Sequence, residues 1–286
     1  MALTLASSGQ GGVFTLRAGS FGGRFRASVN PIPPPSLLLD TYSGAAAAYS
    51  LRKLRTAYAG STIRVRRSSD NTETDIGFVA NALDTASLLT FCGAGNGFVT
   101  TWYDQSGNGI NASNATLANQ PQIVNAGSVI SVNSKPSLQI DTTDFLSLSS
   151  IFLPIKTTFG VIKRNTGTGN FFIYGGGVSH YYFGSITYYE TSNQLSQDNV
   201  ADTTTNQILL SAYNSNSTTL FQYKNNVLQS TTNSGLTRGD EITTLFTYNG
   251  SLFSDGFCQE VVIYSINNSS NLSGINTNIN SYYSIY

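Results

Sequence analysis

The stretch that decides the fold is Phe98-Val-Thr-Thr-Trp102-Tyr103-Asp104-Gln105-Ser106-Gly107-Asn108-Gly109, in which an alternating segment runs into a polar, glycine-rich one. The first part contains the only tryptophan of the chain, and apolar or aromatic side chains fall on both faces of the strand that the alternation predicts. We therefore expect this strand to be buried, or nearly so, on both sides. In the second part, Asp and Asn can hydrogen-bond their own backbone and Gly accepts positive φ, which predicts a shaped loop at the end of a sheet.

The loop is either a ligand site or an architectural corner, and we favour the corner. In that interpretation Trp102 anchors the core while Asp104 holds the turn by accepting hydrogen bonds from backbone amides. Replacing Asp104 with Ala is then expected to lower stability by ~1–2 kcal/mol.

Composition excludes several classes of protein. The 286 residues carry no net charge and only 10% of them are charged, which argues against electrostatic capture of nucleic acid or acidic lipid. The 16 Tyr and 16 Phe argue against disorder. A polar surface dominated by Asn, Ser, Thr and Gly is typical of extracellular β-proteins, virion proteins and sugar-binding proteins.

Cysteine and histidine usage leaves little room for a metal site. Cys92 and Cys258 lie far apart in the sequence, and we expect two free buried thiols. His180 is the only histidine, which excludes multi-histidine metal sites and leaves a Ser-His-Asp triad without supporting context. We expect no metal and no cofactor.

The N-terminal residues 1–36 differ from the rest because they are rich in Gly and contain the run Pro31-Ile-Pro-Pro-Pro35. We expect an extended attachment arm held by a partner, the alternative being a frayed tail. Residues 37–286 are then a single β-sandwich domain. The first residues lack the basic and apolar regions of a signal peptide, and no stretch approaches the ~20 apolar residues of a membrane span. We therefore expect folding in a cytoplasm without membrane insertion.

Helical spacing of apolar residues occurs in three places. Ala47, Leu51, Leu54 and Tyr58 predict a helix from Gly44 to about Ala59. An acidic N-cap and a glycine stop predict a short helix between Asp84 and Gly93, and a closing helix is expected within residues 272–286.

The remaining pattern is that of β-strands. Residues 63–67 alternate with a basic face. We favour arginines that are solvated or that pair with Asp70, Glu73 and Asp75, the alternative being a site for a phosphate or carboxylate. Short alternating segments divided by turn residues continue to the end of the chain, over residues 120–124, 137–141, 145–148, 159–163, 171–174, 181–189, 207–213, 218–224, 242–248 and 257–264. This spacing predicts an all-β antiparallel sandwich or barrel with a few short helices.

Five segments resemble, in order, the catalytic domain of fungal α-L-arabinofuranosidase B, over roughly residues 40 to 125. The C-terminal half is similar to the general concanavalin A-like, laminin-G-like sandwich. The resemblance implies a concanavalin A-like jelly roll with a concave face and loops able to hold sugar. The segments that carry it are Ala48-Tyr-Ser-Leu-Arg-Lys-Leu54, Ile63-Arg-Val-Arg-Arg-Ser-Ser-Asp-Asn71, Asp75-Ile-Gly-Phe78, Leu83-Asp-Thr-Ala86 and Gly95-Asn-Gly-Phe-Val-Thr-Thr-Trp-Tyr-Asp-Gln-Ser-Gly-Asn-Gly109.

The family hydrolyses with retention through a Glu nucleophile and an Asp acid/base, whose carboxyl groups lie ~5–5.5 Å apart. Asp255, followed by Gly256, resembles the context of the acid/base, although Asp-Gly is also a common hairpin turn. Glu190 is the nearest candidate nucleophile by order. The adjacent cysteine pair of the family's sugar pocket and its arabinose-binding second domain have no counterpart here.

The resemblance allows three functions. Such domains also occur in phage fibre and capsid-decorating proteins, and our leading hypothesis is a bacteriophage virion protein made in the host cytoplasm. Residues 1–36 would dock it on capsid or other virion proteins, as a homo-oligomer such as a trimer. Its lectin-like domain would bind glycans through Asp104, Gln105, Asn108, Tyr181 and Tyr188. The alternative is a glycoside hydrolase of the α-L-arabinofuranosidase type, and a third option is a decoration protein without a ligand.

Overall fold

The chain divides into two units between Ser36 and Leu37. The arm predicted over residues 1–36 lies outside the described residues, except for its last one, and stays a prediction. The computed structural model describes residues 36–153, 156–165, 171–176, 179–183, 187–191, 194–197, 205–214, 219–233, 241–248, 250 and 252–286.

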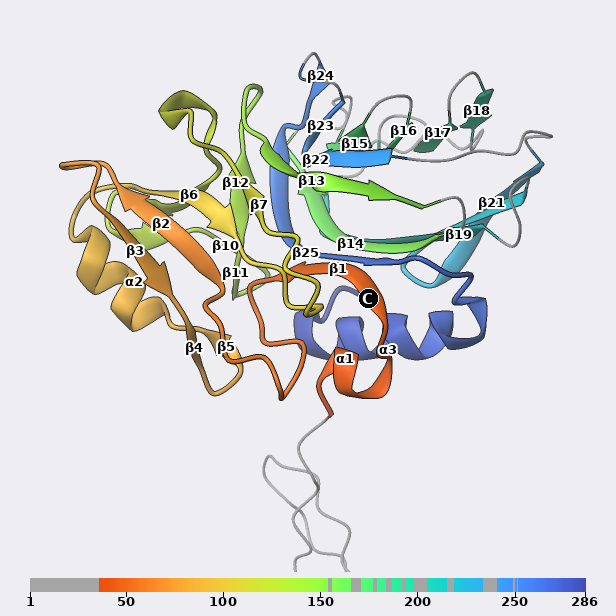
Figure 1. Ribbon diagram of the computed structural model, residues 1–286, viewed down its shortest axis with the longest axis horizontal. Helices are drawn as coiled ribbons and strands as arrows, with labels where there is room; N and C mark the ends of the chain where they lie inside the picture. Colours follow the sequence, from red (N-terminus) through yellow and green to blue (C-terminus); the bar gives the residue numbers. More distant parts are fainter. Residues whose placement is uncertain are drawn as a thin grey trace, which may run out of the picture. The chain divides into compact units, whose positions relative to one another are not determined.

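The unit Leu37–Tyr286 is built around β25 (Gly256–Tyr264), which pairs antiparallel with β1 (Ala45–Ser50), β12 (Leu138–Ile140) and β14 (Thr157–Arg164). Beyond β14 the layer continues through β19 (Ile208–Asn214), β20 (Thr219–Lys224) and β21 (Val227–Asn233). The second layer, above it in Figure 1, runs from β13 through β22 and β15 to β18. Its strands are β13 (Leu146–Phe152), β22 (Glu241–Leu245), β15 (Phe171–Gly176), β16 (Ser179–Phe183), β17 (Thr187–Thr191) and β18 (Gln194–Gln197).

A further lobe joins the layers at one end. There β6 (Gly97–Trp102) lies beside β2 (Ile63–Arg67), and β2 pairs on its other edge with β3 (Glu73–Ile76). β6 also pairs with β7 and β8, and β7 reaches β13, so the strands form one continuous antiparallel sheet folded into layers. The short elements are β4 (Phe78–Val79), β5 (Ala82–Leu83), β7 (Ala112–Ser113), η1 (Leu117–Asn119), β8 (Gln122–Asn125), β9 (Ser128–Val129), β10 (Ser131–Val132), β11 (Lys135–Pro136), β23 (Thr247–Tyr248), β24 (Leu252–Phe253) and η2 (Ser269–Asn271).

This arrangement is the all-β, jelly-roll-like sandwich that the sequence predicts. The core lies between the layers, where Trp102 is fully buried. Its ring centroid is 5.8 Å from that of Tyr49 and 6.2 Å from that of Phe246. Cys92 and Cys258 are buried and free, as expected.

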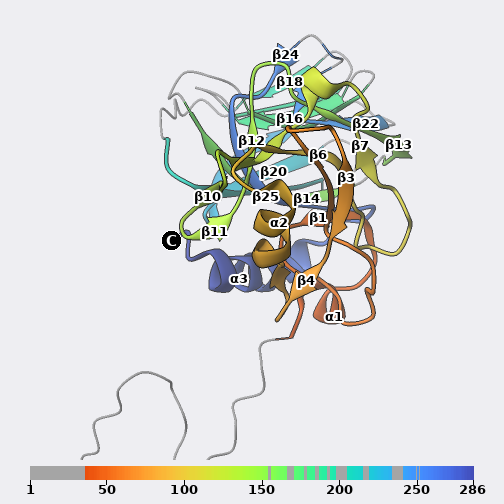
Figure 2. The same ribbon diagram turned by 90° about the vertical axis from the view of Figure 1, so that its left-hand side faces the viewer.

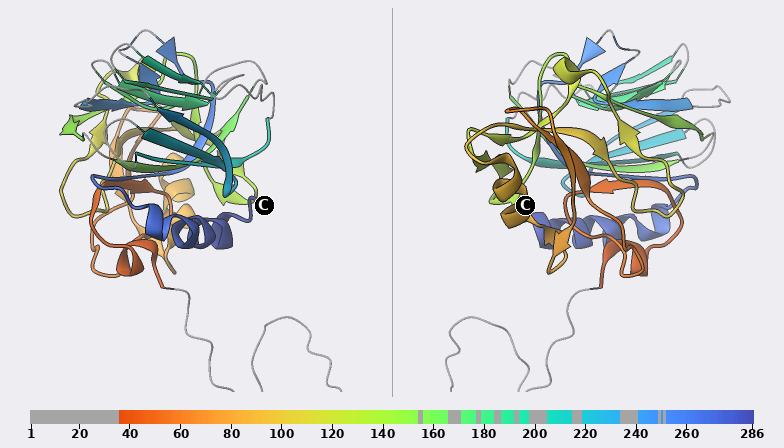
Figure 3. Two further views of the ribbon diagram at one scale, coloured as in Figure 1. Left: turned by 90° about the vertical axis from the view of Figure 1, so that its right-hand side faces the viewer. Right: turned by 60° about the vertical axis from the view of Figure 1, so that its left-hand side comes forward.

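Two of the three expected helices are present. α2 (Thr85–Cys92) begins after Asp84, whose carboxylate accepts a hydrogen bond from Ser87 N at 3.0 Å. α3 (Leu272–Tyr283) lies against the outer face of the layer that contains β1, β14 and β25, as Figures 2 and 3 show from other sides. Its buried apolar residues include Leu272, Ile275 and Ile279.

The helix predicted from Gly44 to Ala59 is wrong. Residues 45–50 form β1 instead, and a short helix, α1 (Leu38–Thr41), precedes it. The alanines have high helix propensity, but they pair with the buried strand β25, and this tertiary contact outweighs local preference. The single strand expected over residues 181–189 is also wrong, because β16 and β17 pair antiparallel with Tyr182 opposite Tyr188.

Candidate functional site

The loop after β6 is a corner that holds β1. Asp104 is 4% exposed, and its Oδ1 accepts hydrogen bonds from Ala48 N at 2.9 Å and Ser106 N at 2.8 Å. Its Oδ2 accepts from Ser106 Oγ at 2.6 Å and Ile110 N at 3.1 Å. One carboxylate therefore joins the turn to a strand more than fifty positions earlier in the chain.

The side-chain amides of Gln105 and Asn108 also join the loop to the backbone of residues 45–54. Gln105 is fully buried, and its Oε1 accepts from Leu54 N while its Nε2 donates to the carbonyls of Ser50 and Arg52. Asn108 Nδ2 donates to the carbonyls of Ala45 and Ala46 at 3.0 and 2.9 Å. The geometry favours the architectural interpretation of this loop, so the ligand roles of Asp104, Gln105 and Asn108 have no structural support.

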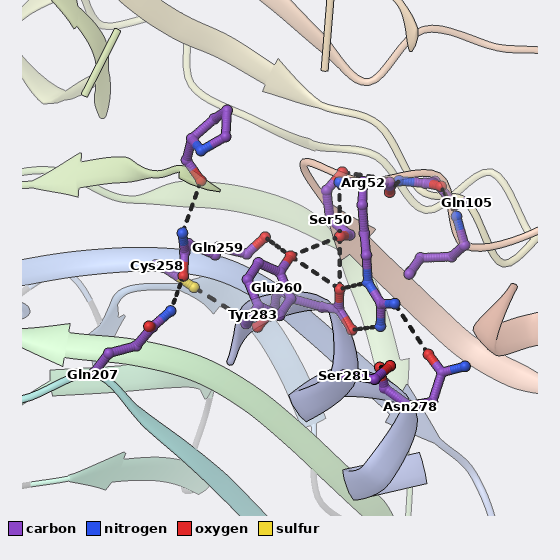
Figure 4. Close-up of polar contacts among 12 residues, drawn as sticks. Ser50, Arg52, Gln105, Gln207, Cys258, Gln259, Glu260, Asn278, Ser281 and Tyr283 are labelled. Carbon is purple, nitrogen blue, oxygen red and sulfur yellow. Dashed lines mark hydrogen bonds and ion pairs between the residues drawn. The ribbon is translucent and has the colours of Figure 1, made fainter. Parts of the chain in front are cut away.

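The sequence did not indicate a buried ion pair beneath the sheet, shown in Figure 4. Arg52 Nε and Nη2 donate to the Glu260 carboxylate at 2.7 and 2.9 Å, and Glu260 is 1% exposed. Ser50 Oγ at 2.8 Å and Tyr283 Oη at 3.1 Å donate to the same carboxylate oxygen, and burial raises the pKa of Tyr283, with the Glu260 charge adding to it. Arg52 also donates to Asn278 at 3.0 Å.

This cluster ties the end of β1 to β25 and α3, and its carboxylate is fully engaged. Glu260 is thus a structural residue and a poor candidate for catalysis. The sequence could not reveal the pair because its partners are separated by 208 positions.

Asp255 is the candidate acid/base in the described part of the chain. It is half-buried beside the start of β25, and Asn165 Nδ2 donates to its Oδ1 at 2.5 Å while Asn165 N donates to its carbonyl oxygen at 3.2 Å. The following Gly256 belongs to β25 and is not part of a hairpin turn. A Cβ atom there would collide with the carbonyl oxygen of Lys163.

The other predicted site residues lie on the β16–β17 hairpin. Glu190 pairs through its backbone with His180, and Tyr181 with Tyr189. The side chains of this hairpin, including that of Tyr188, are outside the described residues.

The basic face of β2 is mostly paired, as favoured. Arg64 Nε lies 3.0 Å from Glu73, and Arg67 Nη2 lies 2.7 Å from Asp70. Arg66 differs, because it is buried and its Nε donates to the neutral Gln120 Oε1 at 2.7 Å. In the described segments, no group of three His, Cys, Asp or Glu residues is placed to hold a metal ion, and no helix is long and apolar enough to cross a membrane.

Comparisons with known proteins agree with this architecture. A family model described as "Alpha-L-arabinofuranosidase B, catalytic" matches residues 40–142. Among solved structures, an arabinofuranosidase complexed with arabinofuranosyl-α-1,2-xylobiose is 16% identical with a TM-score of 0.67. A mutant GH54 α-L-arabinofuranosidase soaked with 4-nitrophenyl α-L-arabinofuranoside is 15% identical with a TM-score of 0.69. No curated protein matches the chain.

Each of these two alignments covers 85% of this chain and 64% of the other one. The chain therefore spans a little under two thirds of the length of those enzymes, and at such low identity the likeness concerns the fold. The family match spans β1, the corner at Asp104 and the strands that the corner joins. Taken together, the chain is an all-β sandwich that resembles the catalytic domain of α-L-arabinofuranosidase B.

Proposed function

We propose that the chain is a glycoside hydrolase-type domain directed at α-L-arabinofuranosyl groups. The observation that supports this most is the family match over residues 40–142, whose segments build the corner and the strands around it. The similarity of the whole sandwich to two α-L-arabinofuranosidase structures supports it further.

In this proposal Asp255 acts as the general acid/base and Glu190 is the candidate nucleophile. The hydrogen bond from Asn165 Nδ2 fixes the orientation of the Asp255 carboxyl group, and the half-buried position leaves it accessible to substrate. A retaining mechanism requires the second carboxyl group to lie ~5–5.5 Å away, to attack the anomeric carbon while Asp255 protonates the leaving oxygen.

The test is release of nitrophenolate from 4-nitrophenyl α-L-arabinofuranoside. We expect turnover by the unchanged chain and a loss of at least ~100-fold in kcat for Asp255→Asn, since general acid–base catalysis contributes about that much or more. Asp75→Asn, which changes an exposed carboxylate on β3, serves as the matched control. Absence of turnover, or full activity in Asp255→Asn, would contradict a hydrolytic role.

A second candidate is a glycan-binding virion protein without hydrolysis. One observation favours it: Glu260, the acidic residue on β25, is enclosed in an ion pair, so it cannot serve as the second carboxylate beside Asp255, which precedes that strand. In this proposal residues 1–36 attach the domain to capsid or other virion proteins, and oligomerisation as a trimer would suit a fibre.

The chain division after Ser36 provides the experiment for this candidate. Deleting residues 1–36 should leave a folded domain that no longer joins the particle. Incorporation at normal occupancy would rule out the docking role, while sugar binding without nitrophenolate release would favour this candidate over hydrolysis.

A further inference from the structure

A polar cavity of about 260 Å³ lies where β6 and β8 of the lobe meet β12. Phe98 and the amides of Gln122 and Gln139 line it, together with the loops at 117–120 and 141–144. The volume is near the lower end of the range for small-molecule sites, ~300 Å³. A space of this size suits a ligand of about one sugar ring.

Three side chains of the cavity form a row across the sheet, and the row continues beyond the cavity to Phe257. Phe98 on β6 lies opposite Gln122 on β8, Gln122 opposite Gln139 on β12, and Gln139 opposite Phe257 on β25. Residues directly opposite in an antiparallel sheet point to the same face. Three strand spacings separate the two phenylalanines, so the row is roughly 14 Å long.

Each ring of the row carries a cation on one face. The Arg66 guanidinium carbon is 4.7 Å from the Phe98 ring centroid, and Lys163 Nζ is 5.6 Å from that of Phe257. Both phenylalanines are half-exposed. A cation on one face orients a ring and leaves the other face for stacking against a ligand.

The walls of the cavity are fixed before any ligand arrives. Asn119 Nδ2 donates to Thr143 O at 2.8 Å, and Phe145 N donates to Asn119 O at 3.2 Å, so the two loops are joined to each other. Arg66 holds the first loop through Gln120 at 2.7 Å and through Leu117 O at 3.2 Å. A preformed site avoids the entropy loss of ordering its loops on binding.

Two side chains of the cavity have unused hydrogen-bonding capacity. Asp144 is 7% exposed, and its Oδ2 accepts from Asp141 N at 2.8 Å, but no donor in the described part of the chain reaches its Oδ1. The Gln139 amide, which is half-buried, likewise makes no hydrogen bond with any described residue. Burial raises the pKa of Asp144 to about 6, with the Asp141 charge adding to the effect. Burying an ionised carboxylate costs free energy of folding, and a carboxylate that stays buried despite this cost is typical of functional sites.

We propose that this cavity binds one residue of a neutral oligosaccharide, and that the rest of the ligand follows the row toward Phe257. A sugar ring is recognised by stacking on an aromatic ring, while amides donate to and accept from its hydroxyl groups and a carboxylate accepts from them. The two carboxylates, Asp141 and Asp144, repel acidic sugars. Asp255 does not line the cavity, and binding there does not depend on hydrolysis.

The test is calorimetric titration of the full chain carrying Asp255→Asn, so that a cleavable probe is not consumed. The probes are L-arabinose, D-xylose, arabinotriose, xylotriose and maltotriose at millimolar concentrations. We expect at least one trisaccharide to bind more tightly than its monosaccharide. Gln139→Ala should weaken binding three- to tenfold, the equivalent of one or two hydrogen bonds.

Two further variants separate binding from folding. Asp144→Asn keeps the shape of the side chain and should weaken binding about tenfold while it raises the melting temperature at neutral pH. Phe257→Ala should remove the advantage of the trisaccharide and leave monosaccharide binding unchanged. Gln229→Ala on β21, at the other end of the sheet in Figure 1, is the matched control and should bind normally. The proposal fails if no probe binds, if Gln139→Ala and Asp144→Asn bind as tightly as the control, or if the cavity takes up Ca²⁺ instead of sugar.

Discussion

Asp104→Ala tests the corner most directly. The substitution removes four hydrogen bonds to one carboxylate. Bonds to a charged group contribute about 1.5–3 kcal/mol each when the partner is then left buried without a substitute. Ala48 N is fully buried and Ile110 is half-buried, so the loss of their acceptor accounts for about 3–5 kcal/mol, and the half-exposed Ser106 adds about 1 kcal/mol.

The expected loss is therefore about 4–6 kcal/mol, well above the ~1–2 kcal/mol that a local turn would give. Urea unfolding at neutral pH, followed by tryptophan fluorescence, measures it because Trp102 is buried beside the corner. Ser106→Ala removes the hydroxyl with its hydrogen bonds to Asp104, Ala46 O and Asn108 N but leaves the Asp104 carboxylate in place. It is the control and should lose about 1 kcal/mol. A loss below 2 kcal/mol in Asp104→Ala, similar to that control, would refute the long-range role of the carboxylate.

The remaining predictions concern three other buried positions. Glu260→Gln leaves Arg52 buried without its counter-charge and should lower the free energy of unfolding by about 3–5 kcal/mol in urea, while pairing Glu260→Leu with Arg52→Met should restore much of it. The raised pKa of Asp144, about 6, means that the folded state binds more protons than the unfolded state between pH 4 and 6. Stability should then fall by about 2–3 kcal/mol as the pH rises through that window, and Asp144→Asn should abolish this part of the pH dependence in thermal melts. Gly256→Ala forces a Cβ atom against the Lys163 carbonyl and should lower stability by about 3 kcal/mol, whereas an unchanged melting temperature would show that the strands can separate there.

The sequence correctly predicted the elements that depend on interactions between neighbouring residues. The cap at Asp84, the apolar stripe of α3 and the alternation of β6 are each set by residues within a few positions of one another. The sequence also identified the corner, because Asp, Asn and Gly in such a loop indicate backbone hydrogen bonding. It underestimated the energy, since the partner of Asp104 in β1 is distant in the sequence.

Contacts between residues far apart in the chain explain the structural features that the sequence did not predict. Residues 45–50 look helical until β25 is available to pair with them. Arg66 resembles its solvated neighbours on β2, yet it is buried because Phe98 and Gln120 lie beside it in the fold. The row of side chains that lines the cavity could not be predicted from the sequence either, because Gln122 and Gln139 lie on a common face only when β8 and β12 are adjacent.

The pairing of β1 with β25 also has a consequence for how the protein is made. The ribosome releases β1 long before β25, so the first strand waits for more than 200 residues of synthesis before its partner emerges. The segment 40–142, which carries the family match, therefore has an open edge on β1 until β25 has been synthesised. Nascent chains stalled before β25 should be protease-sensitive and prone to aggregate through that edge.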